Sequence, residues 1–158
     1  MRQAETLLSK LRSKSWQLRC VESCTAGGLS AAFGAVSGAS DVLDRSWVTY
    51  SNQAKIEEVS VDEDLLKAFG AVSAEVVIAM ANGAVVGAEH NTVAISISGI
   101  AGPGGGSSDK PVGTVFMGFK FPQQAAFAEH YLFTGSRTEI QEKAINQAIK
   151  SVLSFAFD

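Results

Sequence analysis

The sequence has few of the residues that bind metals or form cross-links. It contains two cysteines and two histidines in 158 residues. Cys20 and Cys24 flank the end of a predicted strand at a separation that does not favour a disulfide, and two thiols are too few for a zinc site. With only His90 and His130 beside them, a Cys/His metal cluster is not predicted, although such a count does not exclude carboxylate sites. We therefore expect two reduced thiols.

Long hydrophobic runs and basic clusters are also missing. No run approaches the roughly eighteen apolar residues of a membrane-spanning helix, and residues 1–6 lead into a charged amphipathic stretch without a signal-peptide core. Lys and Arg total 13 against 16 Asp and Glu, which gives a net charge of −3. No segment gathers the basic residues, so neither nucleic acid nor a membrane is expected as a partner. A cytoplasmic location is expected.

The rest of the composition is typical of an ordinary folded domain. Apolar residues make up 46% of the chain and charged residues 18%. A chain of this length can bury about two-thirds of its unfolded surface without disulfides or metals. The sequence therefore predicts one domain spanning residues 1–158.

Hydrophobic periodicity changes repeatedly between the helical and the extended type. Helices are predicted at about 3–14, 26–36, from 52 onward, 65–69, 75–89 and from 136 to 154. Strands are predicted at 16–21, 47–50, 92–98, 112–121 and 125–133, the last two forming a hairpin. Strands that alternate with helices and end in a hairpin predict an α/β fold, with a mixed and partly parallel sheet between helical layers.

Three small polar clusters directly follow strand-like apolar runs. They lie at residues 21–28, 50–55 and 98–106. In an α/β sheet such strand ends meet at one rim, where ligands usually bind. The pattern predicts a single pocket, and an active site is the leading hypothesis.

Ser23 is the first candidate for chemistry. It lies where a strand gives way to a helix, so its hydroxyl could project from the rim beside amide N–H groups that would stabilise an oxyanion. The alternative is that Ser23 or Thr25 caps the helix, which is the more common role of such residues. The Gly-x-Ser-x-Gly elbow of lipases is absent, because Val21 and Thr25 occupy its glycine positions.

A serine nucleophile needs a base, and neither histidine is predicted near the rim. Lys55 falls in the first turn of its helix, where the helix dipole disfavours an ammonium group, and burial would lower its pKa from about 10.4 toward 7 to 8. A neutral lysine there could take the proton of Ser23. The alternative is a solvated lysine paired with Glu57 or Glu58.

Other residues of these clusters have both a functional and a structural interpretation. Tyr50 could bond the lysine or be a half-buried core tyrosine. The glycine-rich residues 99–106 could form an anion-binding nest or a flexible connector, and they match neither a Walker loop nor a dinucleotide fingerprint. Arg137 could bind a phosphate or be a surface residue. Cys24 could be the nucleophile, although a buried thiol is the more common outcome.

Several ordered blocks stand out along the chain. They are Glu22-Ser23-Cys24-Thr25, Val48-Thr49-Tyr50-Ser51-Asn52-x-Ala54-Lys55, Gly70-Ala71-Val72-Ser73, Ser96-Ile97-Ser98-Gly99-Ile100-Ala101-Gly102-Pro103 and Lys110-Pro111-Val112-Gly113-Thr114-Val115. Together these blocks closely resemble the CinA C-terminal domain family, and the resemblance covers about residues 5–153. Blocks in this order and at matching spacing are far more specific than any single motif.

The resemblance implies a three-layer α/β/α domain that converts nicotinamide mononucleotide to nicotinic acid mononucleotide and ammonia, in pyridine nucleotide recycling. It implies no metal and no other cofactor. Ser23 resembles the family nucleophile, Lys55 its base and Tyr50 a supporting hydroxyl. The implied substrate-binding residues are Cys24, Thr25, Gly27, Asn52, Gly99, Ala101, Gly102 and Arg137.

The chain departs from the family pattern near its last helix. Members commonly carry an aspartate where this chain has Ser136, and a second arginine where it has Gln141. These changes leave two alternatives open: a catalytically silent nucleotide-binding accessory protein, or an amidohydrolase of another small amide. A homo-oligomer is also expected, because the apolar helix at about 76–86 and the hairpin offer surfaces that a homodimer could bury.

Overall fold

Helices form where apolar residues recur every three or four positions. In α1 (Arg2–Ser13), Ala4, Leu7, Leu8 and Leu11 are buried on one face. The computed structural model describes residues 2–157. Its further α-helices are α2 (Gly28–Gly34), α3 (Asn52–Val59), α4 (Glu63–Phe69), α5 (Ala74–Ala84) and α6 (Arg137–Phe157).

The strands form one five-stranded sheet in the order β2-β1-β3-β4-β5. They are β1 (Gln17–Glu22), β2 (Leu43–Val48), β3 (Thr92–Gly99), β4 (Thr114–Lys120) and β5 (Phe127–Leu132). β1 pairs in parallel with β2 and with β3, whereas β4 runs antiparallel to both β3 and β5. The prediction of a mixed, partly parallel sheet is confirmed.

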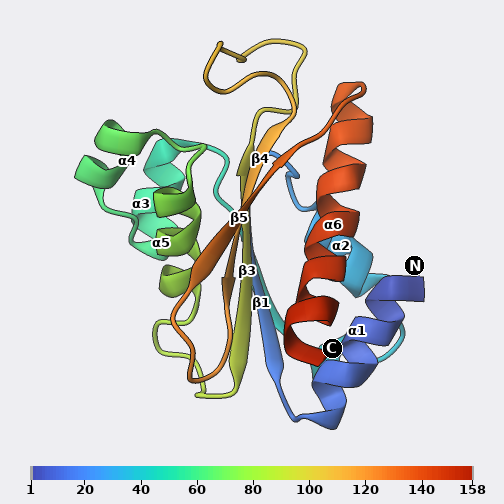
Figure 1. The fold of residues 1–158 in the computed structure, drawn as a ribbon. Coiled ribbons are helices and arrows are strands. Elements are labelled where there is room, and N and C mark those ends of the chain that lie inside the picture. The colour runs from blue at the N-terminus through green and yellow to red at the C-terminus, as the bar shows by residue number, and fades with distance from the viewer. Residues whose placement is uncertain (1, 158) are drawn as a thin grey trace.

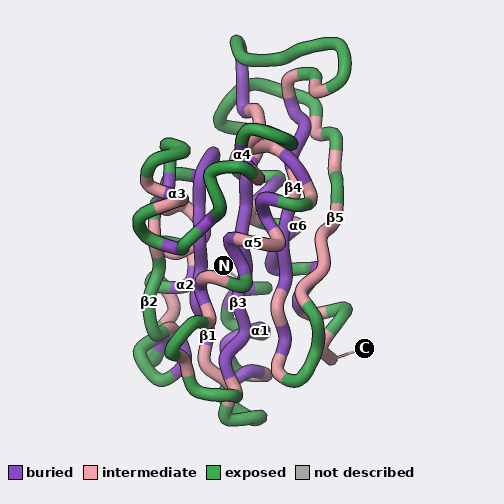
Figure 2. Tube along the Cα trace, turned by 90° about the vertical axis from the view of Figure 1, so that its left-hand side faces the viewer, coloured by how far each residue is buried: buried purple, intermediate pink, exposed green. Residues whose placement is uncertain are grey.

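Helices cover both faces of the sheet, which confirms the three-layer sandwich. α1, α2 and α6 lie on one side and α3, α4 and α5 on the other (Figure 1). Each side has its own apolar core, the first centred on Leu7, Phe33 and Ile97 and the second on Val77 and Met80. Burial is concentrated in β1, β3 and β4, and the edge strands β2 and β5 are more exposed (Figure 2).

Several predicted boundaries differ from the structure, and three of the differences have a local explanation. β2 covers Leu43–Val48 rather than 47–50, because an exposed edge strand carries too many polar residues to read as a strand. α2 begins at Gly28 rather than at 26, since Ala26 and Gly27 have φ values of 48° and 94°. α5 ends at Ala84 rather than at 89, shortly before a left-handed Gly87 with φ 66°.

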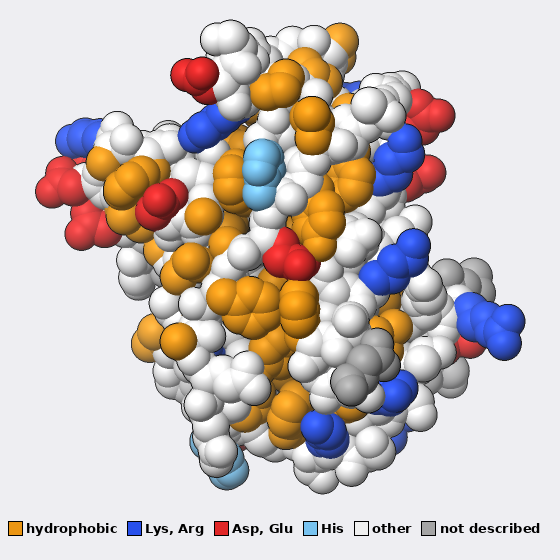
Figure 3. Space-filling view, in the orientation of Figure 1, with side chains coloured by type: hydrophobic (Ala, Val, Ile, Leu, Met, Phe, Trp, Pro, Cys, Tyr) orange, Lys and Arg blue, Asp and Glu red, His pale blue; other side chains and the backbone are white. Residues whose placement is uncertain are grey.

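The two surfaces expected for a second copy, the apolar helix and the hairpin, differ in their exposure. α5 packs its apolar residues against its own sheet, where Val76, Val77 and Met80 are fully buried. Apolar side chains do appear on the face that carries β5, between α5 and α6 (Figure 3), and Leu132 there is 60% exposed. Within residues 2–157, no helix has both the length and the apolar character needed to cross a membrane.

The position of α3 depends on a close contact with α5. A Cβ added at Gly83 would lie 1.9 Å from the carbonyl oxygen of Val59, the last residue of α3. At its other end, α3 is capped by Ser51, whose hydroxyl accepts a hydrogen bond from the N–H of Ala54 at 3.0 Å. The cap predicted at residues 51–52 is confirmed at Ser51, and α3 is fixed at both ends beside the rim of the sheet.

Candidate active site

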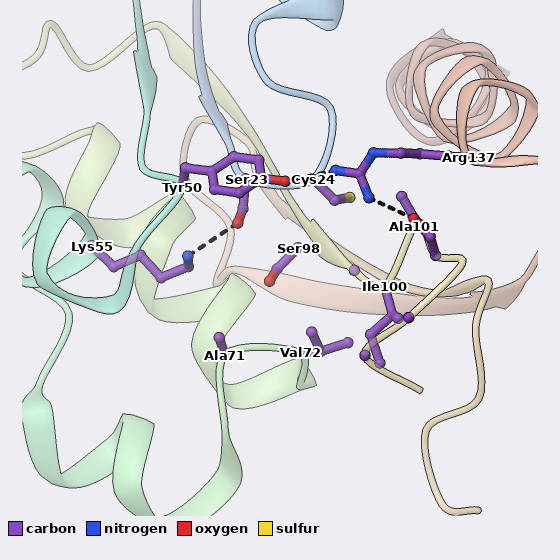
Figure 4. Close-up of a pocket in the computed structure, with 14 residues that line it drawn as sticks. Ser23, Cys24, Tyr50, Lys55, Ala71, Val72, Ser98, Ile100, Ala101 and Arg137 are labelled. Carbon is purple, nitrogen blue, oxygen red and sulfur yellow. Dashed lines mark hydrogen bonds between the residues drawn. The ribbon is translucent and has the colours of Figure 1, made fainter. Parts of the chain in front are cut away.

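A pocket of about 270 Å³ lies at the rim where the parallel strands end, as the three polar clusters predicted. β2, β1 and β3 are neighbours with the same direction, so the residues that follow them meet there. Figure 4 shows the side chains around this pocket. It is lined by Ser23, Cys24, Tyr50, Lys55, Ala71, Val72, Ser98, Gly99, Ile100, Ala101, Gly102, Gly104, Gly105 and Arg137.

Ser23 is the first residue after β1 and is 8% exposed. Its N–H donates to the carbonyl of Ile97 at 2.9 Å, which fixes its backbone against β3. Its Oγ lies 3.1 Å from the Nζ of Lys55 (Figure 4). The N-cap of α2 is Gly27, which makes no side-chain cap hydrogen bond, so the alternative that Ser23 caps the helix is wrong.

Glu22 supplies the missing cap, a role that the sequence did not suggest. Its fully buried carboxylate accepts hydrogen bonds from the hydroxyls of Thr25 and Ser30 and from the N–H groups of Gly27, Leu29 and Ser30. A carboxylate at a helix N-terminus also interacts favourably with the helix dipole. Because Glu22 satisfies these donors, the hydroxyl of Ser23 is free to face Lys55.

Lys55 is almost completely buried, with 1% of its surface exposed. Its Nζ contacts the carbonyl of Thr49 at 2.7 Å and that of Ser51 at 3.5 Å. Burial lowers the pKa of Lys55 from its usual 10.5 to about 8, because a low-dielectric site disfavours the charged amine. The alternative of a solvated lysine is wrong.

The contacts of Lys55 suit an uncharged amine. A neutral amine has two N–H groups and one lone pair. The carbonyls of Thr49 and Ser51 can accept from the two N–H groups, which leaves the lone pair for the proton of Ser23. This arrangement can remove a proton from the serine hydroxyl.

Cys24 lines the pocket but is poorly suited to be the nucleophile. Its thiol is 5% exposed, and burial raises its pKa to about 11, so it is protonated at neutral pH. Only a thiolate is a strong nucleophile. Cys20 and Cys24 are both free, as predicted.

Tyr50 and Arg137 meet over the pocket. The two guanidinium NH₂ groups of Arg137 donate to the Tyr50 hydroxyl and to the Gly102 carbonyl, each at 2.7 Å. Tyr50 is 56% exposed, and its hydroxyl is directed at the arginine rather than at Lys55. The two side chains therefore join the loop after β2 to the glycine-rich loop and the start of α6.

The glycine-rich loop forms a backbone wall of the pocket. Gly102 has φ 80°, and a Cβ there would lie 2.5 Å from a methyl carbon of Val112. Among residues 2–157, no acceptor is found for the N–H groups of Ala101 and Gly102. Lys110 donates to the carbonyl of Phe69 and does not line the pocket. The N–H groups of Ala101 and Gly102 are thus not used by the described part of the protein.

Three predicted binding residues lie outside the pocket lining. Thr25 and Gly27 are bound to the carboxylate of Glu22. Asn52 is exposed and borders a separate depression between α3 and α4. These residues shape the surroundings of Ser23 and Lys55 rather than the pocket surface.

The structure also adds residues that the site prediction did not include. Ala71 and Val72, from the loop before α5, and Ile100 give one part of the pocket an apolar surface. Gln141 donates to the carbonyl of Cys24 at 2.8 Å, so the residue in the position of the missing second arginine supports the serine turn. Only the three-dimensional structure brings α6 and this turn together.

Comparisons with known proteins agree with the fold. The model of the protein family described as "CinA C-terminal domain" matches residues 1–156. A "CinA-like protein" of Syntrophobacter fumaroxidans is 44% identical over 140 residues, which are 89% of this chain but 32% of that protein, so the chain spans about a third of its length. The "Nicotinamide-nucleotide amidohydrolase PncC" of Enterobacter agglomerans is 43% identical over 143 residues, 90% of this chain and 87% of that protein.

A solved structure is similar over nearly the whole fold. The competence/damage inducible protein CihA of Agrobacterium tumefaciens superposes with a TM-score of 0.92 at 32% identity. The match covers 97% of this chain and 93% of that one. Both the layers and the strand order therefore have a counterpart in a protein of known structure.

Proposed function

The chain belongs to the CinA C-terminal domain family, and from this we propose that it hydrolyses the carboxamide of nicotinamide mononucleotide to nicotinic acid mononucleotide and ammonia. The amidohydrolase name of a relative that matches most of both chains supports the substrate. In this proposal Ser23 is the nucleophile and Lys55 its base. One observation carries the assignment: a buried lysine whose Nζ lies 3.1 Å from the Ser23 hydroxyl.

In the first step, Ser23 attacks the carbon of the carboxamide. The proton of the hydroxyl passes to the lone pair of Lys55 as the bond from Oγ to carbon forms. The amide oxygen becomes an oxyanion, which hydrogen-bond donors of the loop at residues 99–106 stabilise. The lowered pKa of Lys55, about 8, supports this role, because a sizeable fraction of the amine is then neutral near pH 7 to 8.

In the second step, the protonated Lys55 returns the proton to the amide nitrogen. The carbon–nitrogen bond breaks, ammonia leaves, and the nicotinoyl group remains as an ester on Ser23. Water then attacks the ester, with Lys55 again accepting a proton and returning it to the serine oxygen. Nicotinic acid mononucleotide is released, and Ser23 and Lys55 return to their starting states.

The remaining pocket surface suits the rest of the nucleotide. The apolar side chains of Ala71, Val72 and Ile100 can contact the pyridine ring. Arg137 uses two of its five N–H donors on protein oxygens, and the others remain for a phosphate. A single arginine can thus bind the phosphate although Gln141 stands in the second arginine position.

The test is ammonia release from nicotinamide mononucleotide by the purified protein. We expect release by the wild type and none above background from Ser23→Ala or Lys55→Arg, since a guanidinium stays charged and cannot act as a base. Full activity of Lys55→Arg would contradict the base assignment. A thermal-shift titration with the same nucleotide distinguishes the two alternatives.

Each alternative has its own result in these assays. A nucleotide-binding accessory protein would be stabilised by the nucleotide without releasing ammonia. An amidohydrolase of another small amide would release ammonia from that amide, and Ser23→Ala would abolish the release. The single domain at residues 1–158, the homo-oligomer and the cytoplasmic location stay predictions.

A further inference from the structure

Strand β3 carries two serines on the face that α5 covers, and only one of them has a protein partner. The hydroxyl of Ser96 donates to the carbonyl of Val77 in α5 at 2.6 Å. Ser98 is two residues further along the same face and is 1% exposed. Its hydroxyl makes no hydrogen bond to any other residue of the part of the chain described, 2–157. α5 begins at Ala74, so Ser98 faces the loop before the helix and the pocket.

An unpartnered hydroxyl in this position calls for an explanation. The hydroxyl oxygen is open to the pocket, because within residues 2–157 the one fully enclosed side-chain polar atom without a partner is Thr49 Oγ1. Ser98 lines the pocket, and Figure 4 shows its hydroxyl directed into the space that Ser23 and Lys55 face. The hydroxyl is therefore available to donate into that space, where the reacting group of a substrate would lie.

The chemistry of the site limits what that partner can be. Lys55 has to protonate the leaving nitrogen, so the nitrogen must lie beside its Nζ, and the planar amide then directs its oxygen elsewhere. Many serine hydrolases stabilise this oxygen partly with the N–H of residues at the nucleophile. Here the N–H of Ser23 already donates to the carbonyl of Ile97 at 2.9 Å. A hydroxyl directed into the pocket from β3 can act as a further donor.

We propose that the Ser98 hydroxyl is a catalytic residue that donates a hydrogen bond to the carboxamide oxygen of the substrate and strengthens it as that oxygen becomes an oxyanion. This inference rests on the proposed function and adds a residue to it. Ser98 lies near the end of β3 and lines the pocket, and its hydroxyl is free to donate a hydrogen bond there. It complements the backbone N–H groups of Ala101 and Gly102.

Steady-state kinetics of Ser98→Ala test this role. Loss of one oxyanion donor lowers kcat by about 10²-fold, and KM should stay within about threefold because the interaction strengthens only in the transition state. Ser98→Thr keeps the hydroxyl and should stay within about fivefold of the wild-type kcat. A Ser98→Ala variant with wild-type kcat, or with a change in KM alone, would overturn the proposal.

Ser96→Ala is the matched control, because it removes a buried hydroxyl from the same strand face but outside the pocket. It breaks a hydrogen bond, so its Tm should fall by about 3 °C while kcat stays unchanged. Ser98→Ala breaks no protein hydrogen bond, so its Tm should stay level or rise. A Tm loss in Ser98→Ala equal to that of Ser96→Ala would indicate a structural role and overturn the proposal.

A boronic acid separates this inference from the identity of the substrate. When 3-pyridineboronic acid binds, the Ser23 oxygen adds to boron, the serine proton passes to Lys55, and boron becomes a tetrahedral anion that mimics the intermediate. We expect about tenfold weaker binding to Ser98→Ala than to the wild type, and no binding to Ser23→Ala. If the boronate behaves so but nicotinamide mononucleotide is not hydrolysed, the proposed function fails and Ser98 keeps its role. If the wild type shows neither activity nor boronate binding, both proposals fail.

Discussion

The two loops that border the pocket are held in opposite ways. The turn at residues 23–27 surrounds a fully buried carboxylate, Glu22, which accepts two hydroxyl and three N–H hydrogen bonds from the turn and from α2. The loop at residues 99–111 is exposed from 103 to 109. It is joined to the rest of the protein mainly at its two ends and through Arg137 and Lys110.

This difference separates two tasks. The turn positions the nucleophile, and a proton transfer to Lys55 requires that position to be constant before the substrate arrives. The glycine-rich loop has to admit a ligand and approach it closely, which favours a backbone with few fixed contacts. We therefore expect changes around the turn to act mainly on kcat, and changes in the loop to act on KM as well as on kcat, because the loop both binds the ligand and supplies oxyanion donors.

Among the changes at the nucleophile and its base, Lys55→Met should have the largest effect on kcat. Without its base, kcat should fall by about 10⁴-fold. The free energy of unfolding, in contrast, should rise. The folded-state pKa of Lys55 is lowered from 10.5 to about 8, so below pH 8 the folded protein holds a charge that is better solvated in the unfolded chain.

The same variant can be followed by urea unfolding at several pH values. Removing Lys55 should raise the free energy of unfolding at pH 7 by up to roughly 3 kcal/mol, at 1.36 kcal/mol per pH unit, and the gain should vanish as the pH rises from 8 to 10.5. Ser23→Ala, which also removes activity, should show no such gain. A Lys55→Met protein less stable than the wild type at pH 7 would argue against the buried amine.

Glu22→Gln tests whether the carboxylate positions the nucleophile. A side-chain amide cannot accept on its nitrogen, so one set of turn donors loses its acceptor and the turn should shift. We expect kcat to fall by about 10²-fold with KM nearly unchanged, and the free energy of unfolding to fall by about 2 to 3 kcal/mol. Glu58→Gln, at an exposed position of α3, is the control and should leave both quantities unaltered. If Glu22→Gln and Glu58→Gln had the same kcat, Glu22 would not be needed to position the nucleophile.

Lowering the pH should also reduce kcat of the wild type, by less than the substitutions at Lys55 and Glu22 do. The neutral amine is the active form in our proposal, so kcat should fall about tenfold for each pH unit below the pKa of Lys55, about 8, and level off above it. The measurement is the initial rate of ammonia release between pH 6 and 10. A rate that does not change between pH 6 and 9 would contradict a lysine base.

Substitutions at two glycines test the role of the glycine-rich loop, and their effects on the kinetic constants should be the smallest. Gly102→Ala places a Cβ 2.5 Å from a Val112 methyl carbon at a φ of 80°, so it should distort the wall, raise KM by about fivefold and lower kcat by a similar factor. Gly104→Ala meets no atom within 4 Å and should leave both constants nearly unchanged. If Gly102→Ala lowered kcat alone, the division of tasks between the two loops would be wrong.

Much of this site could be predicted because strand ends in an α/β sheet share one rim. Ser23 and Lys55 are 32 positions apart, yet each closely follows a strand, and β1 and β2 proved to be parallel neighbours. The helix start at Ser51 and the capping box of Ser136 and Glu139 also follow from local sequence, and both are present. Local hydrogen-bond chemistry and the direction of the strands are therefore legible in the sequence.

The residues that were missed depend on contacts between distant segments. Glu22 looks like a solvated acid at a strand end, and its role appears only when the turn directs its N–H groups inward. An available signal was the pair Gly27 and Gly28 at a helix start that lacks a capping side chain. Gln141 gave no comparable signal, because its contact with the Cys24 carbonyl depends on how α6 lies against the sheet. Ser98 was part of the third polar cluster, but nothing in the sequence distinguished it from its neighbours.

The contact between Gly83 and the end of α3 has a consequence for evolution at the site. Because a single methyl group at Gly83 would collide with the Val59 carbonyl, the helix that carries Lys55 is held in place by the absence of a side chain on another helix. Mutations in the interior of α5 can therefore change the alignment of the proton acceptor without touching any atom of the pocket. Selection for turnover should constrain that helix as closely as it constrains the rim.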